Sequence, residues 1–364
     1  MNVHSGLEGV IACQSAISLV DGQNGRLVYR GYWAKELALH KEFEEVCHLL
    51  WYGELPTEEE LNRLKQKFLE GRKIPAHMMA VIVALPKEMD MMSVIRTCIS
   101  AIANESNEWP PTVEQAIQIT ALIPTIITAR ISILKGKKPI EPHHRLGHIA
   151  NYLYMLHNKE PKVTHIKALE SYCILTMEHG MNASTFAARV ISSTESDIVS
   201  AITGAIGAMK GPLHGGAPSE VTAMLEAIET KENAEEWIRT KLKNGEKLMG
   251  FGHRVYKTKD PRAEALKKVT AQLTKHDPWL ALANAVEETA LRLLTEYKPG
   301  RKLYTNIEFY AAAVLRAVEM PSLLFTPTFT VSRVVGWTAN VIEQAENNRI
   351  YRPQSLYTGV IPGE

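Results

Sequence analysis

The sequence has almost no surplus of charge of either sign. Among its 364 residues, 41 Lys and Arg are balanced by 40 Asp and Glu, which leaves a formal net charge of +1. Proteins that bind a phosphate backbone usually carry a marked basic surplus, which attracts the polyanion. Nucleic acid is therefore not expected as a partner of this chain.

Long apolar runs are also scarce. The longest, Ile117 to Leu134, is interrupted by Gln118, Pro124 and Arg130 and falls short of the roughly 20 residues that a membrane span needs. The segment from Met1 to Gly6 lacks the basic start and apolar core of a secretory signal, and an Arg- and Ser-rich transit segment is missing too. We expect a cytoplasmic protein with no membrane association, in which the run forms a buried helix.

Cysteine is rare and scattered. Cys13, Cys47, Cys98 and Cys173 include no close pair, and none has a neighbouring His at metal-ligand spacing. Neither a disulfide framework nor a zinc site is expected. We predict four reduced and mostly buried thiols.

The residues that are abundant are apolar and follow helical spacing. They make up 45% of the chain, which is enough for a substantial core, and at about 150 residues per domain the length suggests two domains. Val221, Met224, Leu225 and Ile228 follow the i, i+3, i+4, i+7 pattern, and Pro218 suits the first turn of that helix. The organisation predicts a large, mainly helical protein.

Start and stop signals place two further helices. Residues Phe43 to Tyr52 carry an apolar face and are followed by Gly53, a typical helix stop. Thr57 with Glu60 three residues later forms a capping box, which predicts the start of the next helix.

Strand-like alternation appears only near the beginning of the chain. The segments Ile11–Val20 and Arg26–Tyr29 flank the turn-forming residues 21–25, and together they predict a small hairpin. Lys135 to His144, rich in Lys and Pro, is typical of an exposed loop.

A glycine-rich segment, Lys210 to Ala217, surrounds His214 just ahead of the helix expected near Pro218. Its glycines leave the backbone open around the imidazole, and the positive end of the helix disfavours imidazolium. A neutral His can donate a hydrogen bond to a carbonyl as negative charge develops on its oxygen. A plain glycine-rich turn with a solvent-facing His is the alternative.

A second loop, Met249 to Arg262, contains His253 and a concentration of cations. Its basic residues outnumber the lone Asp260 and are Arg254, Lys257, Lys259 and Arg262. Such a loop can fold over the phosphates of a ligand while the imidazole reaches the reacting centre. It contains neither a dinucleotide fingerprint nor a P-loop. A solvated charge run is the alternative.

A third segment, Lys302 to Val314, sets Glu308 against an apolar run. Burial beside Ile307 and Phe309 would raise the pKa of this carboxyl and make it a stronger base once ionised. The alternative is a capping box from Thr305 to Glu308, in which the carboxylate only closes the helix N-terminus.

Arginines could hold a dicarboxylate out of water with their guanidinium forks. Arg333 lies in an apolar setting, where an unpaired charge is costly, so a carboxylate should meet it. Arg352, near the C-terminus, could equally be exposed and solvated. His179 could be a ligand or a core histidine satisfied locally.

The motifs described above, each weak by itself, occur together in a set order along this one chain. Those that carry a family resemblance are Tyr29–Tyr32, Leu49–Pro56, Glu178–Thr185, Gly211–Ala217, Gly250–Arg254, Asp260–Arg262 and Ser332–Arg333. Through them the sequence resembles the citrate synthase family over nearly its whole length. It is most similar to the shorter bacterial and archaeal type, which includes both citrate synthases and 2-methylcitrate synthases.

The resemblance implies an all-α, multi-helical two-domain fold with a small N-terminal β-hairpin, assembled as a homodimer with shared active sites. Residues 1–216 and 321–364 would form the large domain and the dimer interface. Residues 217–320 would form a small domain that closes over substrate. The implied substrates are oxaloacetate and acetyl-CoA, with no metal and no further cofactor.

The resemblance also implies roles for individual residues. His214 matches the group that polarises the thioester carbonyl, Glu308 stands where the family has the base that removes the α-proton, and His253 matches the group that protonates the oxaloacetate carbonyl. The matched oxaloacetate ligands are His179, Arg262, Arg333 and Arg352, the last resembling an arginine lent by the other subunit. The residues expected to contact CoA are Arg254, Lys257 and Lys259.

One departure is Glu308, because the family usually has Asp there. The extra methylene moves the carboxylate, and misplacement by about 1 Å can cost on the order of 100-fold in rate. We expect Glu308 to remain the base with altered efficiency. Two other functions stay open: 2-methylcitrate synthesis from propionyl-CoA, since one methylene gives only roughly 1–3 kcal/mol of discrimination, and a catalytically idle helical scaffold.

Overall fold

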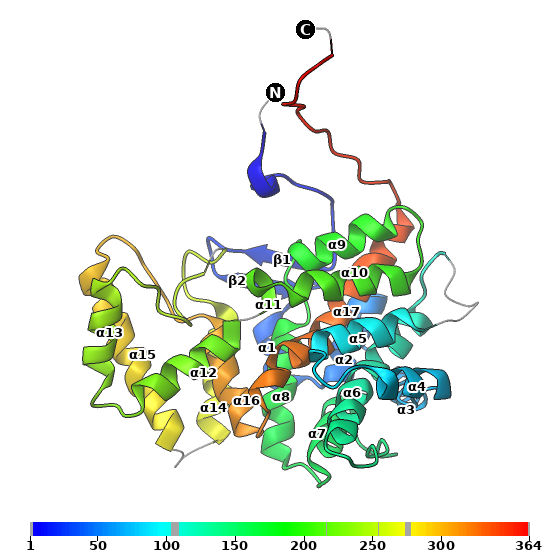
Figure 1. Ribbon diagram of the computed structural model, residues 1–364, viewed down its shortest axis with the longest axis horizontal. Helices are drawn as coiled ribbons and strands as arrows, with labels where there is room; N and C mark the ends of the chain where they lie inside the picture. The colour runs from blue at the N-terminus through cyan, green and yellow to red at the C-terminus, as the bar shows by residue number, and fades with distance from the viewer. Residues whose placement is uncertain (1–2, 103–108, 216, 254, 274–277, 363–364) are drawn as a thin grey trace.

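The computed structural model describes residues 3–102, 109–215, 217–253, 255–273 and 278–362. Helices dominate it, as expected (Figure 1). In the first half they are α1 (Ala34–His40), α2 (Phe43–Tyr52), α3 (Glu58–Gly71), α4 (Ala76–Ala84), α5 (Met91–Ser100), α6 (Val113–Leu134), α7 (His148–His157), α8 (Val163–Thr176) and α9 (Ala183–Ser192). In the second half they are α10 (Ile198–Lys210), α11 (Pro212–Gly215), α12 (Ala217–Ile228), α13 (Ala234–Lys243), α14 (Pro261–Leu273), α15 (Pro278–Tyr297), α16 (Ile307–Ala317) and α17 (Phe325–Glu346). Short 3-10 helices lie at Ser5–Leu7 and Ser322–Leu324.

The helix boundaries read from local signals are confirmed. Helix α2 ends at Gly53, whose φ of 92° is left-handed and therefore suits glycine. Thr57 and Glu60 form the expected capping box at the start of α3. Helix α12 begins at Ala217, and its apolar face is buried as the spacing predicts.

The N-terminal hairpin is present but shorter than expected on one side. Strands β1 (Ser18–Asp21), β2 (Arg26–Tyr29) and β3 (Tyr32–Trp33) form an antiparallel sheet in that order. The expected strand over Ile11–Val20 is wrong before Ser18. Strand β2 has only four residues to pair with, and β1 is accordingly limited to four.

The core is centred on α6 and α17, the two longest helices, around which α2, α8, α9 and α10 pack. Helix α6 is long and apolar enough by composition to cross a membrane, but 78% of its most apolar window is buried inside the structure. It is therefore a core helix, as the sequence predicted. The described cysteines are all unpaired, and Cys47, Cys98 and Cys173 are buried.

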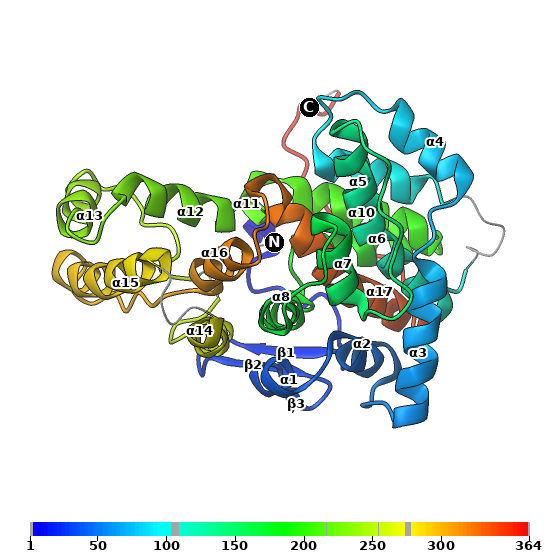
Figure 2. The same ribbon diagram turned by 90° about the horizontal axis from the view of Figure 1, so that it is seen from below.

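Helices α12, α13 and α15 lie together on one side of the molecule, away from α2 to α7 (Figures 1 and 2). Helices α14 and α16 link this side to the rest because both pack against α8. The boundary at residues 217–320 remains a prediction.

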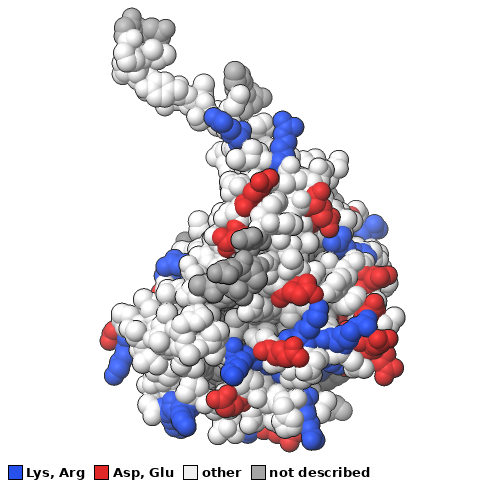
Figure 3. Space-filling view, turned by 90° about the vertical axis from the view of Figure 1, so that its right-hand side faces the viewer, with Lys and Arg blue, Asp and Glu red and all other residues white. Residues whose placement is uncertain are grey.

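The two chain ends leave the body on the same side (Figure 1), and Leu7 and Cys13 of the N-terminal segment line one cavity with Ile350 and Arg352 of the C-terminal segment. The face shown in Figure 3 carries basic and acidic side chains interspersed, in keeping with the balanced composition.

Candidate active site

The loop that carries His253 and the segment that leads into α16 are bonded together. The Gly252 N–H donates to the Tyr304 carbonyl at 2.7 Å, and the Asn306 N–H donates to the Gly250 carbonyl at 2.9 Å. The Asn306 side-chain amide adds a bond to the Gly252 carbonyl at 2.9 Å. Two of the three sequence-predicted segments therefore form one unit.

The glycines of this unit allow it to pack closely. Gly250 and Gly252 both adopt left-handed backbone, with φ of 84° and 81°. A Cβ on Gly250 would lie 2.8 Å from the ring of Phe309 on α16. Glycine is thus required for the loop to lie against the helix that bears Glu308.

His253 is fixed as a neutral imidazole with a defined proton position. Its Nδ1 accepts from the backbone N–H groups of Val255 (3.0 Å) and Tyr256 (3.1 Å). The ring proton is therefore left for Nε2. Burial, with the nearby Arg262 guanidinium adding to it, lowers the pKa of His253 to about 4. Arg262 Nη2 lies 3.1 Å from Nε2, and because a guanidinium only donates, this contact competes with a proton on Nε2.

Asp260 organises the neighbouring arginine and the start of α16. The carboxylate is buried and accepts from Arg262 at three atoms: the backbone N (3.0 Å), Nε (3.0 Å) and Nη2 (2.8 Å). It also accepts from the Ile307 N–H at 3.2 Å, an N-terminal donor that α16 itself leaves unpaired. Burial opposes the charge of Arg262, but Asp260 outweighs it and raises the pKa of the guanidinium.

Glu308 lies in the first turn of α16. Its Oε2 is shielded from solvent and has no hydrogen-bond partner among the described residues. Burial raises the pKa of Glu308, as predicted, and Asp260 contributes in the same direction while Arg262 opposes. The capping-box alternative is wrong: the helix begins at Ile307, and the Thr305 hydroxyl donates to Glu287 at 2.7 Å instead.

His214 lies in the short helix α11 and is half-buried, so the solvent-facing alternative is wrong. Its Nε2 lies 2.7 Å from the Ser184 hydroxyl. Ser184 also accepts from Trp337 Nε1 (2.9 Å) and donates to the Asn182 side-chain oxygen (2.7 Å). Burial, followed by the charge of Arg333, lowers the pKa of His214 to about 4. The imidazole is therefore neutral, as expected, although burial is the main reason.

His179 faces the same centre. Its Nε2 is 3.1 Å from the Tyr256 hydroxyl, and its ring centroid is 5.8 Å from that of His253. Burial, with Arg262 and Arg333 adding to it, lowers the pKa of His179 well below its ordinary value. Tyr256, which also stacks against the Arg262 guanidinium at 5.5 Å, was missed from the sequence. Its place within the cationic loop was the available signal.

Arg333 is buried on α17 with its guanidinium over the Phe329 ring at 4.6 Å. Its Nε donates to the Thr176 carbonyl at 2.7 Å. The carboxylate expected to meet it is not in contact, since no ion pair to Arg333 occurs among the described residues. Burial lowers the pKa of Arg333 to about 10, while the nearby charge of Glu178 opposes this.

Glu178 is buried next to His179 in the chain and ties its loop to two other elements. Its Oε1 accepts from the Ser18 hydroxyl of β1 (3.1 Å) and from the Gly180 N–H (2.6 Å). Its Oε2 accepts from the Asn340 amide of α17 at 3.0 Å. The carboxylate thereby fixes the backbone on both sides of His179.

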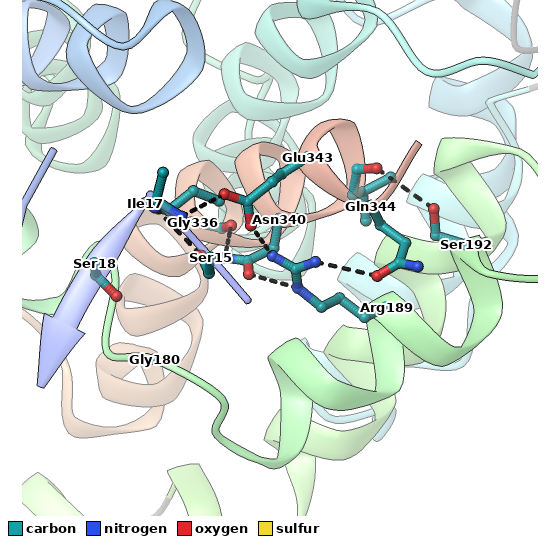
Figure 4. Close-up of polar contacts among 12 residues, drawn as sticks. Ser15, Ile17, Ser18, Gly180, Arg189, Ser192, Gly336, Asn340, Glu343 and Gln344 are labelled. Atoms are coloured by element: carbon teal, nitrogen blue, oxygen red, sulfur yellow. Dashed lines mark hydrogen bonds and ion pairs between the residues drawn. The ribbon is translucent and has the colours of Figure 1, made fainter. Parts of the chain in front are cut away.

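Arg189 extends this network (Figure 4). From α9 its guanidinium points at three side chains of α17, donating to Asn340 at 2.8 Å and Gln344 at 3.1 Å and pairing with Glu343. Glu343 also accepts from the Ala16 N–H at 2.8 Å. Arg189 was not singled out from the sequence, because its partners lie about 150 residues away.

A cavity of about 420 Å³ opens beside the two joined loops. The cationic side chains that line it are Lys257, Arg301 and Lys302. Lys257 was expected there, whereas Arg301 and Lys302 were missed, although both follow a glycine in a basic run. Lys259 does not line the cavity; it pairs with Glu264 at 3.7 Å on the surface. Arg254 lies outside the described residues.

Arg352 is not brought to this centre within one chain. It is exposed in the segment after α17 and lines a different cavity, of about 870 Å³, between the two chain ends. Within the described ranges, no set of three or more His, Cys, Asp or Glu side chains is placed to hold a metal ion.

The arrangement is suited to carbon acid chemistry. A shielded carboxylate and two neutral imidazoles lie around buried guanidinium groups, which would bind a dianionic ligand. Next to them is the cationic cavity, which is large enough to hold part of a phosphorylated molecule of the size of a cofactor.

Comparisons with known proteins point to one family. The family model described as citrate synthase, C-terminal domain, matches residues 6–354. The chain is 40% identical over 365 residues to the citrate synthase of Mycolicibacterium smegmatis, which covers 98% of this chain and 95% of that protein. It is 39% identical over 372 residues to a 2-methylcitrate synthase of Mycobacterium tuberculosis, which covers 100% and 93%.

Solved structures give the same result. The crystal structure of citrate synthase from Thermotoga maritima has a TM-score of 0.89 and 41% identity, covering 100% of this chain and 98% of that one. A ternary complex of carboxymethyl coenzyme A and oxaloacetate with citrate synthase from Thermoplasma acidophilum has a TM-score of 0.89 and 31% identity, with the same coverage.

Proposed function

Because the chain belongs to the citrate synthase family, we propose that it condenses acetyl-CoA with oxaloacetate and water to give citrate and CoA. The observation that carries this proposal is the unit formed by the His253 loop and the start of α16, which supplies an imidazole donor and a shielded carboxylate side by side with Arg262.

In the first step Glu308 removes a proton from the methyl group of acetyl-CoA. A thioester is a weak carbon acid, so a carboxylate succeeds only if the enolate is stabilised as it forms. His214 supplies that stabilisation by donating to the thioester oxygen. The Ser184 hydroxyl donates its one proton to the Asn182 oxygen in the structure, so the donor role of His214 requires this proton to turn to Nε2, which lies equally close at 2.7 Å. The ring proton then sits on Nδ1 and is available to the thioester oxygen.

In the second step the enol carbon attacks the carbonyl carbon of oxaloacetate, and the carbonyl oxygen takes the Nε2 proton of His253. The Nδ1 atom of His253 is engaged by two backbone N–H groups, so Nε2 is the ring nitrogen left to donate. Arg262, Arg333 and His179 bind the oxaloacetate carboxylates and carbonyl. Water then hydrolyses the citryl-CoA thioester and releases CoA.

The 420 Å³ cavity would receive the CoA portion, with Lys257, Arg301 and Lys302 facing its phosphates. The expected small domain, residues 217–320, would close over it and exclude water during condensation. Of the other two expected CoA residues, Lys259 pairs with Glu264 on the surface, away from the cavity, and Arg254 lies outside the described residues.

We also propose a cytoplasmic homodimer in which Arg352 reaches the partner's site. In the segment that carries Arg352, Ile350 is 58% exposed and Leu356 is 65% exposed. In the N-terminal segment, Ile11 is 89% exposed. Apolar surface in this amount is typical of a protein interface. The buried, unpaired cysteines suit a reducing compartment.

A thiol-release assay tests the reaction. The purified protein should release CoA from acetyl-CoA only when oxaloacetate is present, and faster than from propionyl-CoA. A preference for propionyl-CoA would instead establish the 2-methylcitrate reaction, which the M. tuberculosis relative favours as the second candidate. If neither thioester released CoA, the protein would be the catalytically idle helical scaffold of the third hypothesis.

A further inference from the structure

The turn of the N-terminal hairpin packs directly onto the His253 loop. The Gly22 carbonyl accepts from the Lys257 N–H at 2.8 Å. A Cβ on Gly22 would lie 2.3 Å from the Val255 carbonyl oxygen and 2.8 Å from its carbon. In the same turn, a Cβ on Gly25 would lie 2.7 Å from the Thr258 side-chain methyl and 2.8 Å from the Lys259 carbonyl oxygen. At Gly22 the two nearest atoms belong to the Val255 backbone, which cannot yield as the end of a flexible side chain can.

The turn itself is stiff. Asp21 accepts from the Asn24 N–H (3.0 Å) and from its side-chain amide (2.7 Å), which closes the turn on itself. The flanking residues Asp21 and Arg26 are paired in the sheet. The hairpin therefore presents a fixed surface to the loop.

The loop residues that pack on this turn are the ones that hold the His253 imidazole in place. Val255 places its carbonyl against Gly22, and its N–H donates to His253 Nδ1 at 3.0 Å. Tyr256, the next residue, donates to the same nitrogen and meets His179 through its hydroxyl. Lys257, bonded to Gly22, lines the cationic cavity.

We propose that Gly22 is a positioning residue, and that the β1–β2 turn is the support against which the Val255–Lys257 segment is held so that His253 and Lys257 face their ligands. This rests on the proposed roles of those two residues. The turn belongs to the expected large domain and the loop to the expected small domain. The contact therefore has to form each time the expected small domain closes.

The size of the effect follows from the overlap. A Cβ on Gly22 would approach the Val255 oxygen more than 1 Å closer than ordinary van der Waals contact, which begins at 3.4 Å. The loop has to move by about that distance, and displacement of a reacting group by about 1 Å costs on the order of 100-fold in rate. The oxaloacetate ligand Arg333, on α17, does not touch the turn.

The experiment compares Gly22→Ala with Gln23→Ala, an exposed neighbour in the same turn. In the thiol-release assay, Gly22→Ala should lower kcat about 100-fold and raise the KM for acetyl-CoA. Oxaloacetate, measured by calorimetry without acetyl-CoA, should still bind through Arg333 on α17, but more weakly, because His253 and the Tyr256 hydroxyl that meets His179 are displaced. A purely structural role would lower the amount of active enzyme and leave its KM unchanged. Kinetics equal to those of Gln23→Ala would overturn the proposal.

Amide exchange in the unaltered enzyme provides a second readout if Gly22→Ala does not fold. The Lys257 N–H should exchange slowly, and more slowly still with oxaloacetate and a non-reactive CoA thioether bound. Exchange as fast as at exposed loop amides, with or without these ligands, overturns the proposal. If the unaltered enzyme releases no thiol, the proposed function fails and this inference fails with it. An active parent with an equally active Gly22→Ala refutes the positioning role alone.

Discussion

Replacing Asp260 by Asn should damage both folding and catalysis. The carboxylate is only 1% exposed and takes hydrogen bonds from the Arg262 backbone, from two nitrogens of its guanidinium and from the Ile307 N–H. Asparagine keeps the shape but loses the charge, and its amide nitrogen would face donors.

The magnitude follows from the burial of both partners. Arg262 is 5% exposed, so the substitution leaves a buried guanidinium without its counter-charge, which costs about 3–5 kcal/mol of unfolding free energy. Catalysis should suffer in two ways. The Arg262 fork loses the partner that orients it, and the pKa of Glu308 loses one of its upward influences, which makes that carboxylate a weaker base.

The assay is urea unfolding of both proteins at one protein concentration, paired with thiol release in the folded range. Glu264→Gln is the matched control, because Glu264 is an exposed acid in α14, the helix that follows Asp260, and among the described residues its ion pair is with Lys259. The control should lose no more than about 1 kcal/mol. If Asp260→Asn lost no more than the control, Asp260 could not be holding a buried charge.

Three further predictions follow from the site. The pKa values of His214 and His253 are lowered from 6.5 to about 4, so the unfolded chain binds more protons between these values. The unfolding free energy contributed by these groups should be full above pH 6.5 and decline as the pH falls to 4; imidazole titration near 6.5 in the folded protein, followed by NMR, would contradict this. Lys302→Ala should raise the KM for acetyl-CoA about 10-fold with little change in kcat, whereas Lys259→Ala should not. Arg352→Ala should strongly raise the oxaloacetate requirement, and an active monomer would refute the shared site.

Features of the fold that depend on neighbours in the sequence could be predicted. The end of α2 at Gly53 and the capping box of Thr57 and Glu60 are local, and both are as expected. The strand over Ile11–Val20 failed because a strand needs a partner, and β2 offers one only from Ser18. The Thr305 to Glu308 box failed because Glu287, on another helix, takes the Thr305 hydroxyl.

The candidate site shows the same difference between features set by sequence neighbours and features set by distant contacts. His214, His253 and Glu308 could be singled out as candidates because glycines, cations or an apolar run surround them in the sequence. The groups that hold their surroundings in place were not, because their partners are distant in the chain: Glu178 bonds to Asn340, and Gly22 contacts the Val255 loop. Such contacts become visible only in the folded structure.

The central claim is that Glu308 is the base that removes the α-proton of acetyl-CoA. The most direct test is the exchange of that methyl proton with deuterated water, followed by NMR, in the parent, Glu308→Gln and Glu308→Asp. Glutamine cannot accept the proton, so its exchange should fall to background, whereas Asp should retain measurable exchange. A Gln variant that exchanges as fast as the parent would contradict the account.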